Sequence, residues 1–138
     1  MIQKIVVDIT TTLSEGASTH GAVFLGLGGR EFRLDIAQHE DFEEGDDVTY
    51  VFGEESNVLS PERNDPRLGM PLGLEDVATH PVYVRLEPLK KKDDWELASI
   101  RVRVSSREGQ AEFAALQGGS ERLWLGSQSG TILHLRRI

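Results

Sequence analysis

The alternation of apolar and polar side chains is clearest between Val82 and Val104. Every second side chain of V-Y-V-R-L-E, residues 82–87, is apolar, which is typical of a strand with one buried face. Pro88 ends this strand, because proline has no backbone N–H to donate to a β-ladder. After a charged turn, the pattern predicts a second strand that begins at Trp95.

The apolar positions of this second strand change parity along its length. Trp95 and Leu97 share one parity, whereas the apolar residues at positions 100, 102 and 104 share the other. Successive side chains of a strand point to opposite faces, so a regular strand cannot bury both sets. The pattern therefore predicts a bulge or bend near Ala98–Ser99.

Shorter alternations of the same kind occur along most of the chain. They predict further strands around residues 5–10, 22–27, 31–36, 48–52, 111–115 and 131–136, a short apolar element at residues 123–125, and a hairpin turn at Gly28-Gly29. Residues 53–79 contain three prolines and little periodicity, which predicts a long irregular loop with one short helical turn near Leu74–Val77. About eight short strands separated by turns indicate an all-β sandwich or barrel, and we expect one domain over residues 1–138.

The apolar positions of these alternations predict the core. We expect the following side chains to be mostly buried: Val23, Leu25, Phe32, Leu34, Tyr50, Phe52, Val84, Leu86, Trp95, Ile100, Val102, Phe113, Trp124 and Leu133.

Composition excludes several classes of function. The net charge of −8 argues against nonspecific nucleic-acid binding, which needs a basic surface to neutralise phosphates. The chain has no cysteine, which excludes disulfides and thiolate zinc sites. No apolar run approaches the roughly 20 residues of a membrane span. The N-terminal segment enters a strand pattern directly and has no secretory signal, so we expect a cytoplasmic location, with secretion not excluded.

One turn carries the strongest candidate binding motif. Leu89, Lys90, Lys91 and Lys92 lie between the two central strands, and together they could form a loop that contacts a membrane or a partner. An apolar tip can insert into lipid while each lysine near an anionic surface contributes about 1 kcal/mol. Asp93 and Asp94 oppose that attraction, and a solvated hairpin turn is the simpler interpretation.

Signals for catalysis or metal binding are weak. The four histidines have no metal-ligand spacing, and there is no Gly-x-Ser-x-Gly motif to anchor a serine nucleophile. Six of the ten residues from 38 to 47 are acidic, but they lack the regular ligand spacing of a calcium loop, which favours a solvated loop over a cation site.

Four segments in order resemble the PLAT family, the polycystin/lipoxygenase/alpha-toxin or lipoxygenase-homology domain. G-A-S-T-H-G-A-V-F, residues 16–24, is similar to the family's Gly-x-Gly-Thr-Asp-Ala-x-Val-Tyr segment. F-E-E-G-D-D-V-T-Y, residues 42–50, resembles its Phe-Glu-x-Gly segment, and D-W-E-L-A-S-I-R-V, residues 94–102, resembles its Trp-x-Leu-x-x-Val-x-Val strand. R-L-W-L with G-T-I-L-H-L, residues 122–135, is similar to its closing element and last strand. The resemblance covers about residues 5–136.

The resemblance implies a sandwich of two four-stranded antiparallel sheets that acts as a noncatalytic binding module. Members bind protein partners or membranes, and some bind calcium through loops. This chain has His20 and Glu87-Pro88-Leu89 where calcium-binding members often have oxygen ligands. We therefore disfavour calcium and expect no cofactor. We expect a protein partner first, a membrane lipid as the alternative, and a small hydrolase without a recognisable motif as the remaining alternative.

Overall fold

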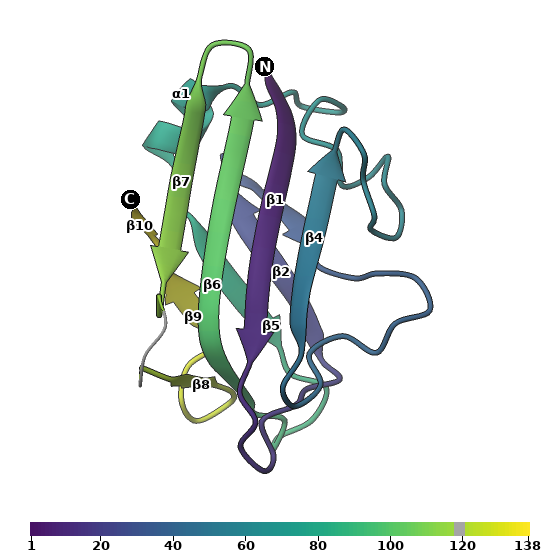
Figure 1. Ribbon diagram of the computed structural model, residues 1–138, viewed down its shortest axis with the longest axis vertical. Coiled ribbons are helices and arrows are strands. Elements are labelled where there is room, and N and C mark those ends of the chain that lie inside the picture. The colour runs from purple at the N-terminus through teal and green to yellow at the C-terminus, as the bar shows by residue number, and fades with distance from the viewer. Residues whose placement is uncertain (118–120) are drawn as a thin grey trace.

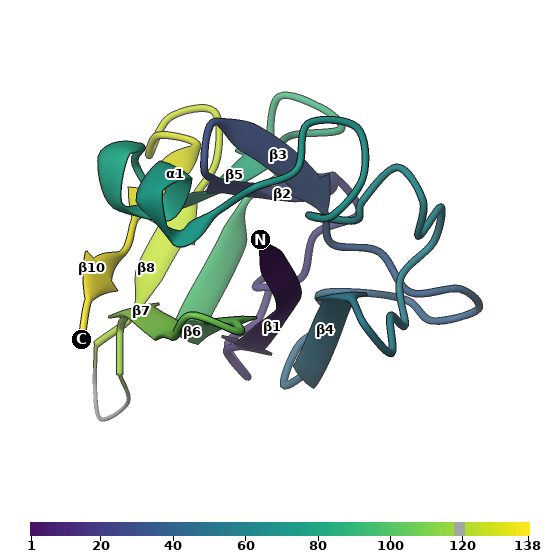
Figure 2. The ribbon, with the colours of Figure 1, turned by 90° about the horizontal axis from the view of Figure 1, so that it is seen from above.

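The computed structural model describes residues 1–117 and 121–138, and it consists of two packed antiparallel sheets (Figures 1 and 2). The larger sheet has six strands, with β10, β7, β6, β1 and β4 side by side in that order and β8 paired to β6. The smaller sheet has the order β3-β2-β5-β9. The elements are β1 Ile2–Thr11, β2 Ala22–Leu27, β3 Arg30–Arg33, β4 Asp47–Gly53, α1 Leu74–Thr79, β5 Tyr83–Glu87, β6 Trp95–Ser106, β7 Gln110–Ala115, β8 Leu123–Leu125, β9 Ile132–His134 and β10 Arg136–Arg137.

The predicted all-β sandwich is confirmed, but the strands are divided differently from the expected four and four. The single last strand predicted at residues 131–136 is two strands in two sheets. β9 pairs with β5, and β10 pairs with β7. The backbone changes sheets at Leu135, whose N–H still donates to the carbonyl of Val82 at 2.9 Å. Alternation within one short segment could not reveal this change of partner.

Nearly all of the predicted core is buried. Of the fourteen side chains expected in the interior, twelve are buried, whereas Trp124 and Leu133 are half-buried. Trp124 lies in β8, a three-residue strand that, among the described residues, pairs only with the end of β6. Leu133 lies in β9, the last strand of the four-stranded sheet. Both misjudged residues therefore lie at the edges of the sandwich.

The predicted bend in β6 is confirmed as a bulge. Thr10 of β1 faces Ser99, but the next residue, Thr11, faces Leu97, which leaves Ala98 as the extra residue. This irregularity lets both apolar sets of β6 enter the core, because it resets which face each half presents. Trp95 is fully buried, and its indole N–H donates to the hydroxyl of Thr11 at 2.9 Å.

The long irregular loop covers one open side of the sandwich. Asn57 imitates a neighbouring strand beside the edge strand β4: its side chain accepts from the Val51 N–H and donates to the Thr49 carbonyl, each at 2.8 Å. Asn64 occupies one edge donor of the other sheet, because its side-chain oxygen accepts from the Arg33 N–H of β3 at 2.8 Å. Exposed strand edges invite pairing with other chains; Asn57 occupies a donor and an acceptor of β4, and Asn64 occupies a donor of β3.

The predicted helical turn is the short helix α1, which follows this loop. Within residues 1–117 and 121–138, no helix has the length and apolar character needed to cross a bilayer.

Candidate functional site

The candidate loop lies at one end of the sandwich. The turn between β5 and β6, residues 88–94, projects from the lower end of the molecule in Figure 1. Leu89, Lys90, Lys91 and Lys92 are all exposed, and Leu89 has 70% of its surface accessible. The structure thus brings together all four residues singled out from the sequence, on the solvent side of one turn.

A buried aspartate fixes the shape of this turn. One carboxylate oxygen of Asp93 accepts from the Leu89 N–H at 2.7 Å, and the other accepts from the Thr19 hydroxyl at 2.6 Å. The first bond closes the turn, and the second ties it to the loop between β1 and β2. Hydrogen bonds to a carboxylate are stronger than neutral ones, so Leu89 is presented by a turn whose backbone is already held in place.

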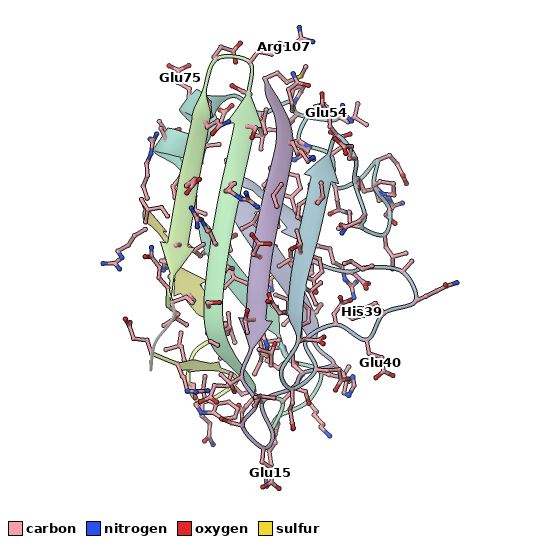
Figure 3. All side chains as sticks on the ribbon, in the orientation of Figure 1. Glu15, His39, Glu40, Glu54, Glu75 and Arg107 are labelled. Carbon is pink, nitrogen blue, oxygen red and sulfur yellow. The ribbon has the colours of Figure 1, made fainter. Side chains whose placement is uncertain are left out.

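A second apolar tip lies in the neighbouring loop, residues 12–21. Leu13 is the most exposed large apolar side chain described, with 83% of its surface accessible. This loop is anchored to β6, because the Thr12 hydroxyl donates to the buried carboxylate of Glu96 at 2.6 Å. Glu15 extends from the same loop at the end of the molecule (Figure 3). Residues 12–21 and 88–94 together form what we call the loop end.

The one buried carboxylate of the loops at this end is used by the protein itself. Both carboxylate oxygens of Asp93 already accept hydrogen bonds from the protein. In the described part of the chain, no group of three or more His, Asp or Glu side chains is placed to hold a metal ion. At the positions flagged by the resemblance, His20 and Pro88 supply no carboxylate.

The outer face of the four-stranded sheet carries a second candidate surface, which the sequence reasoning did not identify. Two adjacent cross-strand rows point outward. The first row holds Arg33, Phe24, Arg85 and Ile132, and the second holds Glu31, Gly26, Tyr83 and His134. We call the outward side chains of Phe24, Glu31, Tyr83, Arg85, Ile132 and His134 the outer platform.

Gly26 allows an aromatic ring to lie across the platform. A Cβ at this position would overlap Cε1 and Cζ of Tyr83, so the ring covers the strand where the glycine has no side chain. From there the Tyr83 hydroxyl donates to Glu31 at 2.9 Å, on the far side of β2. Burial and this bond to a carboxylate both raise the pKa of Tyr83. The ring is therefore held as a neutral hydrogen-bond donor.

Glu31 also fixes the side chain of Arg85. Its guanidinium donates two hydrogen bonds of 2.8 Å to the two oxygens of Glu31, and its Cζ lies 4.5 Å from the centre of the Phe24 ring. The pair is partly shielded, with 27% of the Arg85 side chain and 31% of the Glu31 side chain exposed. Mainly through this bond, Arg85 lowers the pKa of Glu31. A forked, stacked arginine beside a fixed tyrosine is a rigid surface feature.

The available sequence signal for the platform was the identity of outward-facing residues. Phe24, Tyr83 and Arg85 occupy the parity that the alternation assigned to solvent, yet two of them are aromatic. Large aromatic side chains on the solvent face of a strand indicate a surface that contacts something else. The partnership with Glu31 required knowledge of strand register, which the sequence lacks.

His20 and His39 line one hollow together with Asp41, and the other histidines lie elsewhere in the fold. His39 lies 3.4 Å from Asp46 and 3.9 Å from Asp41, His80 bonds the carbonyl of Asp76, and His134 packs edge-on against Tyr83.

Comparison with known proteins identifies the fold. No family model matches the chain, and no curated protein matches it. Among solved structures, the alpha-toxin of Clostridium absonum aligns with 98% of this chain at a TM-score of 0.63 and 21% identity. An alpha-toxin from an avian strain of Clostridium perfringens aligns with 98% at 0.60 and 19%. A coral 8R-lipoxygenase, described as activated by calcium via a C2-like domain, aligns with 97% at 0.61 and 17%.

At these identities the similarity establishes the fold alone. It confirms the architecture expected from the resemblance, because toxin and lipoxygenase structures share this sandwich over nearly the whole chain. This chain spans 31% of each alpha-toxin and 17% of the coral lipoxygenase.

Proposed function

We propose that this chain, which has a PLAT-type fold, is a noncatalytic module that binds a protein partner through the outer platform. The observation that carries the proposal is the fixed arrangement of Tyr83 and Arg85 on an uncovered sheet face. On this face Ile132 and His134 are exposed, and Phe24, Tyr83 and Arg85 are half-buried.

The chemistry of the platform supports a protein partner. Tyrosine and arginine are enriched among the residues that dominate binding energy at protein interfaces, where a flat patch of aromatic and aliphatic groups is typical. Ile132, with 46% of its surface exposed, adds an apolar contact beside Arg85. Because Tyr83 and Arg85 are already ordered by Glu31, little side-chain entropy is lost when a partner binds.

A noncatalytic role is supported by the same hydrogen bonds. Glu31 is engaged by both Arg85 and Tyr83, and its lowered pKa keeps it ionised and unavailable as a general acid near neutral pH. A platform whose charged groups satisfy each other suits recognition more than proton transfer.

Site-specific photo-crosslinking tests the proposal. A photoreactive residue replaces Ile132 on the platform, or Ser129 in the exposed β8–β9 turn as the matched control. In lysate of the native host, we expect one discrete adduct from position 132 and none of that mass from position 129. Unlabelled wild-type protein should compete for this adduct, whereas protein carrying Tyr83→Ala and Arg85→Ala should not. Equal competition by the double variant would reject the platform as the binding surface.

The loop end supports a membrane surface as a second candidate. Leu13 and Leu89 are the two large apolar side chains exposed at this end, with 83% and 70% of their surfaces accessible, and three lysines adjoin Leu89. Apolar tips beside cationic groups are the arrangement that interfacial binding requires. Glu15 and the net charge of −8 oppose it, which is why a protein partner ranks first.

Liposome co-sedimentation separates the two candidates. The vesicles contain phosphatidylcholine alone or with phosphatidylserine, with and without calcium. If the loop end binds lipid, a variant with Leu13→Ser and Leu89→Ser should lose sedimentation, and Lys91→Glu should reduce it only on anionic vesicles. Tyr83→Ala serves as the control that leaves lipid binding unchanged. Sedimentation of wild type with this pattern, combined with failure of the crosslinking test, would make the membrane the preferred partner.

A further inference from the structure

A hollow of about 560 Å³ lies in the outer face of the six-stranded sheet, and it belongs to neither surface described above. Small side chains form its floor. Thr10 of β1 faces Ser99 of β6 across one strand pair, and Ala114 of β7 faces Arg101. The bulge at Ala98 lies next to Ser99. A row of short side chains beside an irregular strand therefore leaves space that a sheet face normally fills.

One wall of the hollow supplies oriented acceptors. The Thr49 hydroxyl donates to Asp8 at 2.5 Å, and the Thr10 hydroxyl donates to Asp47 at 3.2 Å. Each bond uses the only proton of the hydroxyl, so the threonine oxygens keep lone pairs. Asp47 also keeps its second carboxylate oxygen.

The opposite wall supplies donors. Arg101 uses one nitrogen, Nη2, to donate to Glu112 at 2.6 Å, and the guanidinium has five N–H groups. Among the hydrogen bonds between described residues, none uses the hydroxyl of Ser99 or the amide of Gln117. Both line the hollow. Donors and acceptors thus face each other across a space of ligand size.

We propose that this hollow binds a saccharide. A sugar hydroxyl donates and accepts at the same time, so a ring with vicinal hydroxyls can donate to Asp47 while it accepts from Arg101 and Gln117. A carboxylate that accepts from such hydroxyls forms charge-assisted bonds, which are stronger than neutral ones. The hollow falls in the range of about 300–1,000 Å³ that small-molecule sites occupy.

Charge favours this neutral ligand over a basic peptide. Asp8 is paired with Arg103 at 3.3 Å, and Arg101 is paired with Glu112 at 2.6 Å. These pairs cancel four of the charges around the hollow, and Asp47 is the one lining carboxylate without an ion-pair partner among the described residues. A ligand rich in hydroxyls matches that balance better than a run of lysines.

The experiment is an amide chemical-shift titration of the ¹⁵N-labelled chain with maltose, cellobiose, lactose and mannobiose. At least one sugar should shift the amides of Thr10, Asp47, Ser99, Arg101 and Gln117, and leave those of Tyr83 and Arg85 on the other sheet unchanged. Asp47→Asn should weaken this binding about tenfold, since it removes one charge-assisted bond. Gln117→Ala, an exposed change with no folding cost expected, should weaken it severalfold. Glu75→Gln on α1, at the far end of the molecule (Figure 3), is the control that should not change it.

A second arm distinguishes free sugar from glycan on a protein. Ribonuclease B carries a mannose-rich glycan that ribonuclease A lacks on the same polypeptide. Shifts with ribonuclease B alone would assign the site to protein-linked glycans, and shifts with the disaccharides alone would assign it to free sugar. The proposal is overturned if none of these probes shifts the hollow, if the shifts fall on the platform or loop end, or if trilysine binds the hollow more tightly than every sugar.

Discussion

The two outer faces of the sandwich are built from the same alternation but present opposite surfaces. On the four-stranded sheet, Tyr83 and Arg85 reach across β2 to Glu31 and form a flat platform. On the six-stranded sheet, the central side chains are short, and Asp47 and Arg101 surround a hollow. The platform satisfies its charged groups internally, whereas the hollow keeps donors and acceptors that no described residue uses.

The comparison shows that the effect of a small residue on the shape of a sheet face depends on the side chains of the neighbouring strands. The Tyr83 ring occupies the space above Gly26 that a side chain would take, so this face is flat at that position. Ala114 lies between Arg101 of β6 and Arg136 of β10, and the row beside it holds Thr10 and Ser99. The short side chains make a platform where an aromatic ring lies across them, and they line a hollow where no ring does.

Removing the shared core should damage both faces at once. Trp95→Ala should lower the free energy of unfolding by about 3–5 kcal/mol. The change leaves a large cavity between the sheets, and the buried hydroxyl of Thr11 loses its hydrogen-bond partner. Urea unfolding followed by circular dichroism measures the loss. Trp124→Ala is the matched control, since Trp124 is half-buried and should cost clearly less. Equal losses for the two tryptophans would contradict the assigned packing.

Replacing each of the two edge asparagines should show how much stability each sheet edge gains from the long loop. Asn64→Ala should cost about 1–3 kcal/mol, because Asn64 is only 9% exposed and its loss leaves the Arg33 N–H without its partner. Asn57 is exposed, so water can replace its bonds, and Asn57→Ala should cost less than about 1 kcal/mol. Parallel thermal and urea unfolding of both variants checks this order, and the reverse order would show that the six-stranded edge depends more on the loop.

Adding one methyl group at Gly26 should impair partner binding at the platform without changing sugar binding in the hollow. Gly26→Ala forces the Tyr83 ring to move and breaks its bond to Glu31, which should cost about 1 kcal/mol of stability. Partner crosslinking at position 132 should fall sharply, while sugar-induced shifts in the hollow should not change. Gly73→Ala is the control, because a Cβ there meets nothing closer than an Asp76 oxygen at 3.7 Å. Retained crosslinking in Gly26→Ala would separate partner binding from Tyr83.

The smallest effect concerns the segment that connects β3 of one sheet to β4 of the other. Burial raises the pKa of Asp41, and the nearby Asp35 carboxyl raises it further, although bonds from Tyr50 and from the Ile36 N–H oppose the shift. A group with a raised folded-state pKa stabilises the fold below its unfolded pKa, and this contribution is lost as pH rises through the folded value. Asp41→Asn should therefore gain up to about 1 kcal/mol relative to wild type at neutral pH.

The difference between Asp41→Asn and wild type should disappear in acid. Urea midpoints measured from pH 3 to pH 8 test the sign. His39, which lies between Asp41 and Asp46, is replaced by Gln in a companion series, so that its charge does not obscure the result. A gain for Asp41→Asn that grows toward low pH would contradict the assignment.

Local pattern was enough to predict the parts of the fold that depend on one strand. The parity change after Leu97 predicted the bulge at Ala98, and the buried position of Trp95 followed from it. The tip formed by Leu89 and the lysines was also predictable, because a turn between two strong strands must be exposed.

Features that depend on register between distant segments were not predictable. The bond between Arg85 and Glu31 joins residues 54 positions apart, and the bond that ties the β1–β2 loop to the β5–β6 turn joins Thr19 and Asp93, 74 positions apart. Periodicity assigns a side chain to a face, but it does not say which side chain of another strand lies opposite. The hollow needs four strands in register, so no single stretch of sequence contains a signal for it.

The position of β1 has a consequence for how the protein is made. β1 lies between β4 and β6, and its ladder to β6 pairs Ile5 with Val104, about a hundred residues later in the chain. When β1 of a nascent chain is complete, neither of its neighbours has been synthesised, because β4 begins at Asp47 and β6 only at Trp95. Such long-range pairing makes folding slow, in the millisecond-to-second range typical of all-β domains. Until its neighbours are made, the apolar face of β1 stays exposed, and exposed apolar surface of this kind favours aggregation.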